Sequence, residues 1–245
     1  GNRFAFHKQD FSDNAELNRT LEGAEFDRIV HLGAQAGVRY SIENPHAYVE
    51  ANLVGHLNML ELARHRGVEH MVYASSSSVY GGNTKLPFAV EDRVDHPLSL
   101  YAATKKADEL MSETYAHLYR LPLTGLRFFT VYGPWGRPDM MMWIFTKKIM
   151  AGELIPVFNH GDMWRDFTYI DDIVDGIIGA LDYPPEPGAH RDLNIGDSHP
   201  GGLMEMIETL EKAIGREAIA VMRPMQPGDV QATYADISAL HYRTF

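Results

Sequence analysis

Short apolar runs alternate with longer segments of helical spacing in the first half of this sequence, and this alternation constrains the fold most. Strands are expected at residues 4–7, 26–32, 70–75 and 123–129, and helices at residues 13–22, 45–66 and 101–119. The helix at 45–66 begins with Pro45, carries regularly spaced leucines and ends before Gly67. Strands and helices that alternate in this way form a parallel sheet with helices on both faces, so the predicted class is α/β.

The pattern becomes more interrupted after Thr130. Residues 131–142 are rich in Gly and Pro. We expect further helices ending near residues 151 and 181 and at 203–214, a further short strand at 155–158, and a C-terminal helix end at 242–245. Interrupted α/β material of this kind indicates a second, smaller lobe that comes after the larger core.

Tyr101 and Lys105 carry the clearest chemical signal. They lie four residues apart on a predicted helix, so their side chains share one face. A phenol is a poor base at neutral pH because its ordinary pKa is about 10, but a nearby ammonium favours the phenolate. A hydroxyl from the serine run at 75–78, where a predicted strand ends, could bind the same substrate oxygen. Such groups can oxidise an alcohol to a ketone if a hydride acceptor lies opposite, although the Tyr and Lys alone could equally be surface residues.

Charge and composition exclude several classes of protein. The net charge of −11 argues against a general nucleic-acid binder, which would carry a basic footprint. The sequence has no Cys, which excludes disulfides and thiolate chemistry. No apolar run approaches the roughly 18 residues of a membrane helix, and no signal peptide is visible. We therefore expect a cytoplasmic protein that binds neither nucleic acid nor membrane.

Four aspartates between residues 166 and 175 raise the question of a metal site. Asp171 and Asp172 stand where a helix is expected to begin, and carboxylates are favoured at helix N-termini. No His joins Asp166 or Asp175 at the spacing of metal ligands. We predict capping by Asp171 and Asp172, and no metal.

The strand, the serine run ending in Val79-Tyr80-Gly81 and the Tyr-x-x-x-Lys helix together resemble the extended short-chain dehydrogenase/reductase family. The resemblance implies a Rossmann-type doubly wound parallel sheet. The family's first strand and Gly-rich turn have no match in these residues, and we expect that part to lie upstream of this chain. It also implies an incomplete NAD-binding domain at 1–130 and a mainly substrate-binding lobe at 131–245, with segments near 155–182 and 190–197 returning to the core.

Site residues come from the same resemblance. Aligned on Val79-Tyr80-Gly81, the catalytic hydroxyl falls on Ser76, with Ser75 and Ser77 as weaker alternatives, beside Tyr101 and Lys105. The implied cofactor is NAD, with contacts from Asp10, Phe11, Leu32, Gly33, Ala34, Gln35, Asn52, Ala74, Tyr101, Lys105 and Phe128. The implied substrate contacts are Ser76, Ser77, Thr130, Arg137, Phe158, Arg165 and Asp229. Simpler interpretations stay open for three of these: Asn52 as an exposed helical residue, Thr130 as a strand end and Arg137 as a solvated loop charge.

Two positions after Ser76 bear on the reaction. Related 4,6-dehydratases carry Asp-Glu where this chain has Ser77 and Ser78, and related decarboxylases carry Glu at the place of Ser78. Residues 127–139, 158–177 and 225–236 resemble bacterial UDP-glucuronate 4-epimerases. The resemblance therefore implies an NAD-dependent isomerase of UDP-sugars in polysaccharide biosynthesis, acting as a homodimer through helices 45–66 and 101–119. The alternatives are a UDP-glucose 4-epimerase, another sugar-nucleotide enzyme of the family, or an inactive NAD-binding sensor.

Overall fold

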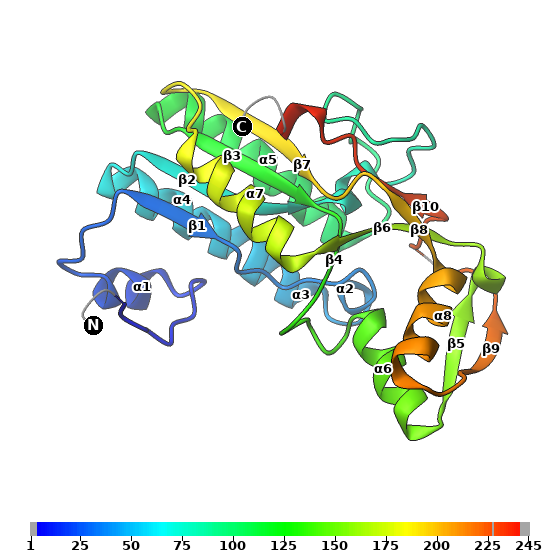
Figure 1. The fold of residues 1–245 in the computed structure, drawn as a ribbon. Helices are drawn as coiled ribbons and strands as arrows, with labels where there is room; N and C mark the ends of the chain where they lie inside the picture. Colours follow the sequence, from blue (N-terminus) through cyan, green and yellow to red (C-terminus); the bar gives the residue numbers. More distant parts are fainter. Residues whose placement is uncertain (1–3, 227, 241–245) are drawn as a thin grey trace. The chain divides into compact units, whose positions relative to one another are not determined.

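The computed structural model describes residues 4–226 and 228–240, which are drawn in Figure 1. The chain divides into two compact units and passes between them several times. The first unit comprises Gly1–Gly81, Val94–Leu126 and Ala180–Asp192, and the second comprises Gly82–Arg93, Arg127–Gly179 and Leu193–Phe245. The predicted C-terminal helix end at 242–245 lies outside the described residues.

The central sheet has the strand order β1-β2-β3-β7. Its strands are β1 (Arg28–His31), β2 (His70–Ser76), β3 (Leu123–Phe128) and β7 (His190–Ile195). Strands β1 and β2 run parallel, with Ile29 opposite Met71. Helices α4 (Gly55–Arg66) and α5 (Leu100–Tyr119) lie along the same face of this sheet (Figure 1), and their apolar residues share one core cluster with Met71 and Leu123. The predicted α/β class with a parallel central sheet is confirmed.

The helix predicted at 45–66 forms with one irregularity. It consists of α3 (Pro45–Tyr48), the π-helical segment η1 (Val49–Val54) and α4, which ends at Gly67 in the left-handed conformation. π-Helical segments are rare and occur frequently at functional sites. Here the segment contains Asn52, whose side chain is buried.

The strand predicted at residues 4–7 is wrong. These residues adopt no regular structure, and Phe4 and Phe6 are 84% and 76% exposed. A strand needs a neighbouring strand to bind its backbone N–H and C=O groups, and no described strand pairs with this segment. The next prediction is confirmed, since helix α1 (Asn14–Thr20) comes after it, capped by the Asp13 carboxylate that accepts a hydrogen bond from the Glu16 N–H.

In the second unit, β6 (Trp164–Tyr169) is the central strand of a small sheet. It pairs in parallel with β4 (Thr130–Tyr132) and β10 (Ala232–Thr233), and antiparallel with β8 (Pro200–Gly202). A separate parallel pair joins β5 (Leu154–Phe158) to β9 (Ile219–Arg223). Helices α6 (Met141–Ala151) and α8 (Leu203–Ile214) pack together and bury Ile155 and Val157 of β5 (Figure 1).

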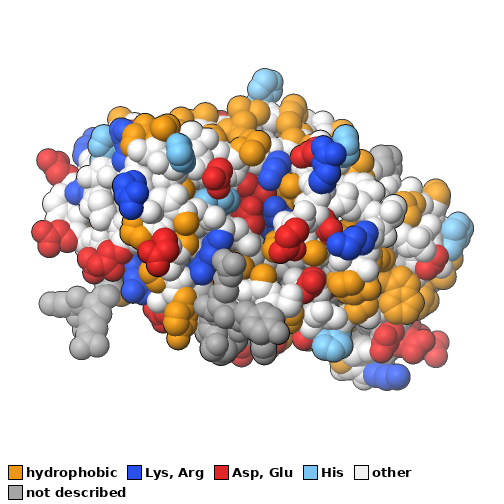
Figure 2. All heavy atoms as spheres, turned by 90° about the horizontal axis from the view of Figure 1, so that it is seen from above, with side chains coloured by type: hydrophobic (Ala, Val, Ile, Leu, Met, Phe, Trp, Pro, Cys, Tyr) orange, Lys and Arg blue, Asp and Glu red, His pale blue; other side chains and the backbone are white. Residues whose placement is uncertain are grey.

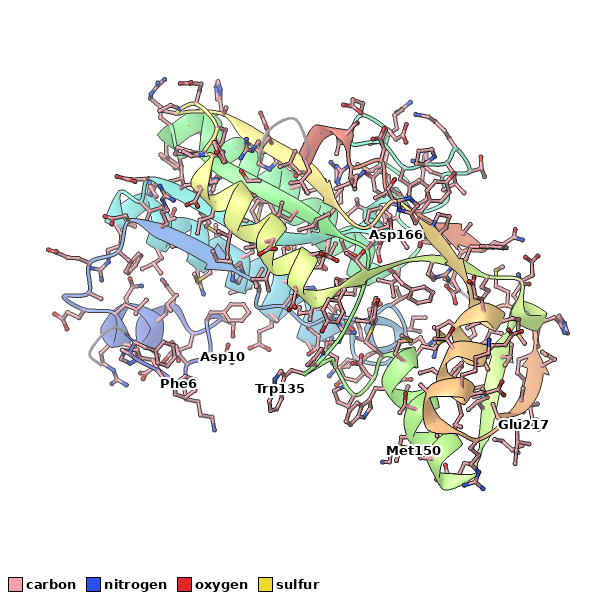
Figure 3. All side chains as sticks on the ribbon, viewed as in Figure 1. Phe6, Asp10, Trp135, Met150, Asp166 and Glu217 are labelled. Carbon is pink, nitrogen blue, oxygen red and sulfur yellow. The ribbon has the colours of Figure 1, made fainter. Side chains whose placement is uncertain are left out.

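Asp166, on β6, accounts for much of the order in this sheet. Its carboxylate is fully buried and is labelled in Figure 3. It accepts hydrogen bonds from the backbone N–H groups of Asp197 (2.8 Å), Ser198 (3.0 Å) and Ala235 (3.0 Å), and from the Thr168 hydroxyl (2.9 Å). A buried carboxylate needs such donors to offset the loss of hydration. Asp166 therefore ties β6 to two loops distant in the sequence.

Two other aspartates lie where a helix was expected to begin. Asp171 and Asp172 occupy the first turn of helix α7 (Ile170–Asp182). Among residues 4–226 and 228–240, no three His, Asp or Glu side chains are grouped so that they could hold a metal ion.

One face of the molecule shows how charges of both signs are distributed. On the face shown in Figure 2, acidic and basic side chains are interspersed. Within the described part of the chain, no helix combines the length and apolarity that crossing a bilayer requires.

Candidate active site

The predicted catalytic serine ends the strand β2. Ser76 is its last residue and is 7% exposed. Its hydroxyl oxygen accepts a hydrogen bond from the Ser78 N–H at 3.2 Å and so caps the short 3₁₀ helix η2 (Ser77–Tyr80). The neighbouring Ser75 hydroxyl instead donates a hydrogen bond to the Glu109 carboxylate at 2.7 Å, so its proton is already engaged. Geometry therefore favours Ser76 over Ser75 as the reactive serine.

Tyr101 is placed by the start of α5. The Ser99 hydroxyl caps this helix by accepting a hydrogen bond from the Ala102 N–H at 3.1 Å, so Tyr101 stands in the first turn. Its half-buried ring meets the ring of Tyr48 edge-on, with centroids 6.0 Å apart. Tyr48 is itself held by hydrogen bonds from its hydroxyl to the carbonyls of Ala36 and Gly37. The Tyr101 ring is thus fixed on one side and accessible in part.

Lys105 connects helix α5 to strand β2. Its ammonium donates to the Ala74 carbonyl at 2.9 Å and to the Asp108 carboxylate at 3.0 Å, and its side chain is only 4% exposed. These bonds use two of the three protons of an ammonium group. Ala74 lies two residues before Ser76 on the same strand. The structure therefore brings Ser76, Tyr101 and Lys105 together on two adjoining elements of one unit.

Asn52 holds the loop after strand β1. Its amide oxygen accepts from the Gln35 N–H at 2.8 Å, while its amide nitrogen donates to the Gln35 carbonyl at 3.0 Å and to the Thr104 hydroxyl at 2.9 Å. The alternative of an exposed helical Asn is wrong, because the residue is 1% exposed. Asn52 thus holds the backbone at Gln35 next to α5. Leu32, Gly33 and Ala34 directly precede Gln35 in the loop after β1.

The segment before helix α1 carries Asp10 and Phe11. Asp10 is exposed, as Figure 3 shows, and hydrogen bonds from the N–H and hydroxyl of Ser12 hold the pKa of its carboxyl below the ordinary value. The Phe11 ring packs so closely that a Cβ added at Gly33 or Gly55 would lie 2.7 or 2.3 Å from it. Gly33 therefore accommodates the Phe11 ring, which places Phe11 and the loop after β1 side by side.

Two predicted substrate residues lie together in the second unit. The Arg165 guanidinium donates to the Asp229 carboxylate at 2.7 Å and to the backbone carbonyls of Val230 and Gln231 at 2.8 and 3.0 Å. The side chains of Arg165 and Asp229 are 17% and 28% exposed. The two residues form one half-buried polar group, although the sequence separates them by more than sixty positions.

Other predicted contacts take simpler positions. Arg137 forms a two-bond ion pair with Asp139, at 2.9 and 3.0 Å, and is exposed. Half-buried positions are held by Ser77 in η2, Phe128 at the end of β3, Thr130 at the start of β4 and Phe158 at the end of β5. Trp135, in the loop between Thr130 and Arg137, projects outward in Figure 3 and is fully exposed.

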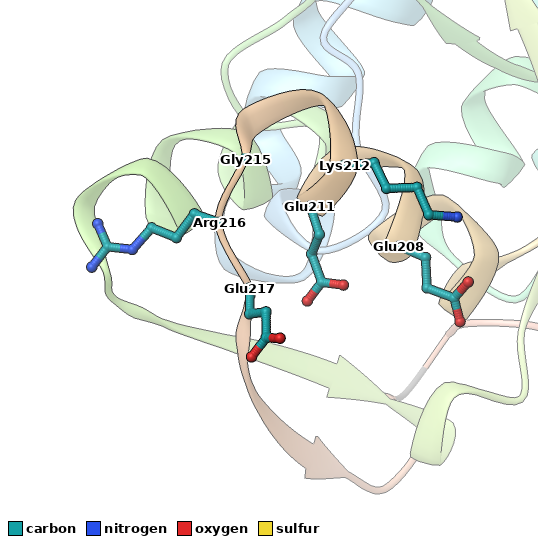
Figure 4. Close-up of a pocket in the computed structure, with 6 residues that line it drawn as sticks. All are labelled: Glu208, Glu211, Lys212, Gly215, Arg216 and Glu217. Atoms are coloured by element: carbon teal, nitrogen blue, oxygen red, sulfur yellow. The ribbon is translucent and has the colours of Figure 1, made fainter.

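A shallow depression at the end of helix α8 lies apart from these residues in the chain (Figure 4). It is lined by Glu208, Glu211, Lys212, Gly215, Arg216 and Glu217. The Arg216 side chain points away from the other five and donates to the Met150 carbonyl at 3.0 Å. Three carboxylates in one depression do not suit an anionic ligand, so this depression is not a candidate site for the diphosphate of a nucleotide.

Two residues that the sequence did not single out contribute to the site around Tyr101. Asp108 binds the Lys105 ammonium, and Tyr48 supports the Tyr101 ring. The spacing of Asp108, three residues after Lys105, was a usable signal because such pairs meet on a helix face. Tyr48 had no such signal, since its contact depends on how two helices pack.

Comparison with known proteins identifies the class. Residues 1–196 match the NAD dependent epimerase/dehydratase family, and the chain belongs to this family. A probable UDP-glucuronate 4-epimerase of Rhizobium meliloti is 51% identical over 248 residues, which span 95% of this chain and 73% of that protein.

Solved structures agree with this assignment. The UDP-glucuronic acid 4-epimerase of Bacillus cereus, in complex with UDP-glucuronic acid and NAD, superposes with a TM-score of 0.89 at 32% identity. The match covers 100% of this chain and 76% of that one. The UDP-glucose 4-epimerase of Thermus thermophilus, in complex with NAD, gives a TM-score of 0.89 at 27% identity, covering 99% and 79%.

Proposed function

We propose that this protein is an isomerase that inverts the 4-position of a UDP-sugar, converting UDP-glucuronate to UDP-galacturonate with NAD as its bound cofactor. The observation that carries the proposal is the grouping of Ser76, Tyr101 and Lys105 at the end of β2 and the start of α5. Relatives of this chain are UDP-glucuronate 4-epimerases, and a structural neighbour holds both UDP-glucuronic acid and NAD. We propose that the product, a sugar nucleotide, is a precursor for polysaccharide synthesis in the cytoplasm.

The residues of the first unit fit a dinucleotide. The exposed Asp10 carboxylate can accept a hydrogen bond from an adenine amino group, and Leu32 offers apolar surface that is 50% exposed. The third proton of the Lys105 ammonium remains for a ribose hydroxyl. We assign cofactor binding to this unit, with Asn52 acting through the Gln35 backbone, and substrate binding mainly to the second unit.

The proposed mechanism divides between a proton and a hydride. When bound, NAD supplies reversible acceptance of the hydride from C4 of the sugar. The Tyr101 phenolate takes the proton of the 4-hydroxyl, and the Ser76 hydroxyl binds the same oxygen. Lys105 favours the phenolate by its charge. The 4-keto sugar would rotate in the site so that C4 presents its other face, and Tyr101 would then return the proton to the 4-oxygen.

Epimerisation is favoured over elimination because of the two residues after Ser76. Loss of water from the sugar requires an additional acid and base. Ser77 and Ser78 stand next along the chain, within the 3₁₀ helix η2. Neither side chain carries a carboxylate, so the chemistry supported here ends with the return of the hydride.

Substrate contacts in the second unit belong to the same proposal. Arg165 is assigned to the diphosphate because a planar guanidinium matches phosphate oxygens, and Asp229 holds that guanidinium in position. Phe158 is assigned to the uracil ring. Phe128 completes the cofactor contacts. Arg137, now paired with Asp139, is assigned to a negatively charged part of the substrate.

A panel of UDP-sugars tests the proposal directly. The purified protein should interconvert UDP-glucuronate and UDP-galacturonate, observed by chromatography or NMR, without net consumption of added NAD. Preference for UDP-glucose would identify the protein as a UDP-glucose 4-epimerase instead. Retention of NAD with no turnover on any UDP-sugar would identify an inactive NAD-binding protein and contradict the proposed reaction.

The choice between sugars is tested at Thr130. A glucuronate pocket must bind the 6-carboxylate in a protein whose net charge is −11, and it must keep the 4-keto acid from losing carbon dioxide. We assign binding of the 6-carboxylate to the Thr130 hydroxyl and backbone N–H. Thr130→Ala is expected to lower kcat/KM for UDP-glucuronate by about tenfold or more, with less effect on UDP-glucose and with some pentose product. Product analysis by NMR measures both effects.

Thr209→Ala is the matched control for this prediction. Thr209 lies on α8, where its exposed hydroxyl donates only to the Glu205 carbonyl of its own helix. This variant should behave as the parent protein on both sugars. Equal losses on both sugars in Thr130→Ala, with no pentose, would assign Thr130 to strand β4 alone.

Assembly provides another prediction. Apolar side chains remain exposed along η1 and α4 at Val54 (44%) and Leu57 (39%), and along α5 at Leu110 (58%) and Leu118 (61%). We propose that these faces pair with a second copy of the chain to form a homodimer. Sedimentation should then give twice the chain mass of 27.6 kDa, and Leu110→Asp should lower it to the monomer value.

Leu154→Asp serves as the control for assembly. Leu154 is 55% exposed on β5, within the second unit. A dimer should persist in this variant. A parent protein that sediments as a monomer at micromolar concentration, or a Leu110→Asp variant that stays dimeric, would contradict the proposed interface.

A further inference from the structure

Asp108 is a fully buried carboxylate beside the proposed catalytic lysine. Its Oδ2 lies 3.0 Å from the Lys105 Nζ, and the side chain is 0% exposed. Its Oδ1 has no hydrogen-bond partner among the described residues. A buried carboxylate usually binds several donors, so this one is held in place chiefly by a single ammonium.

The groups facing Asp108 define which charges matter. His56 from α4, Tyr73 from β2 and His31 from β1 lie around the Lys105–Asp108 pair. Burial lowers the pKa of His31 to about 3 and that of His56 well below its ordinary value, and it raises the pKa of Tyr73 well above 10. All three rings are therefore neutral near pH 7.

Strand β7 brings Asp192 and His190 near this cluster, and these two residues form an ion pair with each other at 3.4 Å. The nearest carboxylate along α5 is that of Glu109, the next residue. It accepts hydrogen bonds from the Ser75 hydroxyl and from Lys106 at 3.0 Å. Glu109 therefore binds Lys106, the residue next to Lys105. Within this buried cluster, Lys105 and Asp108 are each other's direct charge partners.

We propose that Asp108 is a positioning residue for the reaction. Its carboxylate holds the Lys105 ammonium against the Ala74 carbonyl and balances part of the lysine charge that acts on the Tyr101 phenol. This inference rests on the proposed function, because it takes Tyr101 as the base. It assigns Asp108 no contact with substrate or cofactor.

How far Asp108 offsets the charge of Lys105 depends on whether its carboxyl group is protonated. Burial raises the pKa of this carboxyl to about 7, although the neighbouring ammonium acts in the opposite direction. Above that pH the carboxylate offsets the lysine charge. Below it, the neutral acid leaves that charge uncompensated, which favours the Tyr101 phenolate more strongly. The ionised Asp108 carboxylate therefore weakens the effect of the lysine charge on Tyr101 at and above neutral pH.

The pH profile of kcat/KM tests this role in Asp108→Asn, which keeps the shape but removes the charge. Its acid limb reports ionisation of the base in the free enzyme. Loss of the negative charge should move that limb to lower pH by about one unit, a tenfold change in proton affinity, as expected for a unit charge several ångströms away. An unchanged limb, or a shift to higher pH, would overturn the proposal.

Glu109→Gln is the matched control, since it removes a buried carboxylate from the next position of the same helix. Because Glu109 binds Lys106, the acid limb of the Glu109→Gln profile should move much less than that of the Asp108→Asn profile. An equal shift in both variants would show that total buried charge matters rather than the pairing with Lys105, and would overturn the positioning role.

An NMR titration tests the same pairing without any assay. In the parent protein labelled with [γ-¹³C]aspartate, one carboxyl should titrate near pH 7, and Asp108→Asn should lack this signal. Lys105→Met should move it to still higher pH, because the ammonium no longer favours the carboxylate. Absence of any such signal in the parent would overturn the proposal even if the variants fail to fold. If no UDP-sugar is turned over, the proposed function fails, but this titration still decides whether Asp108 pairs with Lys105.

Discussion

Tyr101→Phe is expected to lower turnover by about 10³–10⁴-fold, the upper part of the range for loss of a general base. The substitution removes only the hydroxyl. The ring keeps its edge contact with Tyr48, and the Lys105 bonds to Ala74 and Asp108 do not involve the phenol. The variant should therefore fold normally and retain NAD. Steady-state assays on the preferred UDP-sugar, with the bound cofactor quantified after denaturation, measure both effects.

Two other variants provide a scale for this result. Ser76→Ala should cost less, on the order of 10²-fold, because the serine orients the reacting oxygen and does not take its proton. Tyr119→Phe removes the hydroxyl of another tyrosine on the same helix, with its ring under the Arg64 guanidinium, and should leave turnover unchanged. Near-normal turnover of Tyr101→Phe on every active substrate would show that another group takes the proton.

Asp166→Ala is expected to have the largest effect on stability. The substitution leaves the N–H groups of Asp197, Ser198 and Ala235 without their acceptor, and the N–H of Ala235 is fully buried. A buried donor without a partner costs about 1–3 kcal/mol, and two part-buried donors add to this loss, so the free energy of unfolding of the second unit should fall by about 3 kcal/mol. All three tryptophans, at positions 135, 143 and 164, belong to this unit, so tryptophan fluorescence during urea denaturation reports its unfolding.

Asp171→Ala is the control for this measurement. Asp171 lies exposed in the first turn of α7, where a carboxylate contributes about 0.3–1 kcal/mol through the helix dipole. Its urea midpoint should stay close to that of the parent. An Asp166→Ala midpoint no lower than that of Asp171→Ala would mean that other acceptors or water replace the carboxylate.

Much of the fold could be predicted because its signals are local. Apolar runs and helical spacing predicted β2 and α5 within one residue at either end, and α8 at its observed bounds. The segment at residues 4–7 shows where local signals fail. Its alternating aromatic residues indicated a strand, but a strand also depends on a neighbouring chain segment.

The candidate site divides in the same way. The sequence by itself predicted that a strand ends in the serine run and that Tyr101 and Lys105 share a helix face, since both depend only on the pattern along one element. Only the tertiary structure decided that Lys105 reaches the Ala74 carbonyl, that Asn52 clamps the Gln35 backbone, and that Asp166 gathers N–H groups from distant loops. These contacts join residues far apart in the chain, and their free energy comes from burying polar groups that no local pattern records.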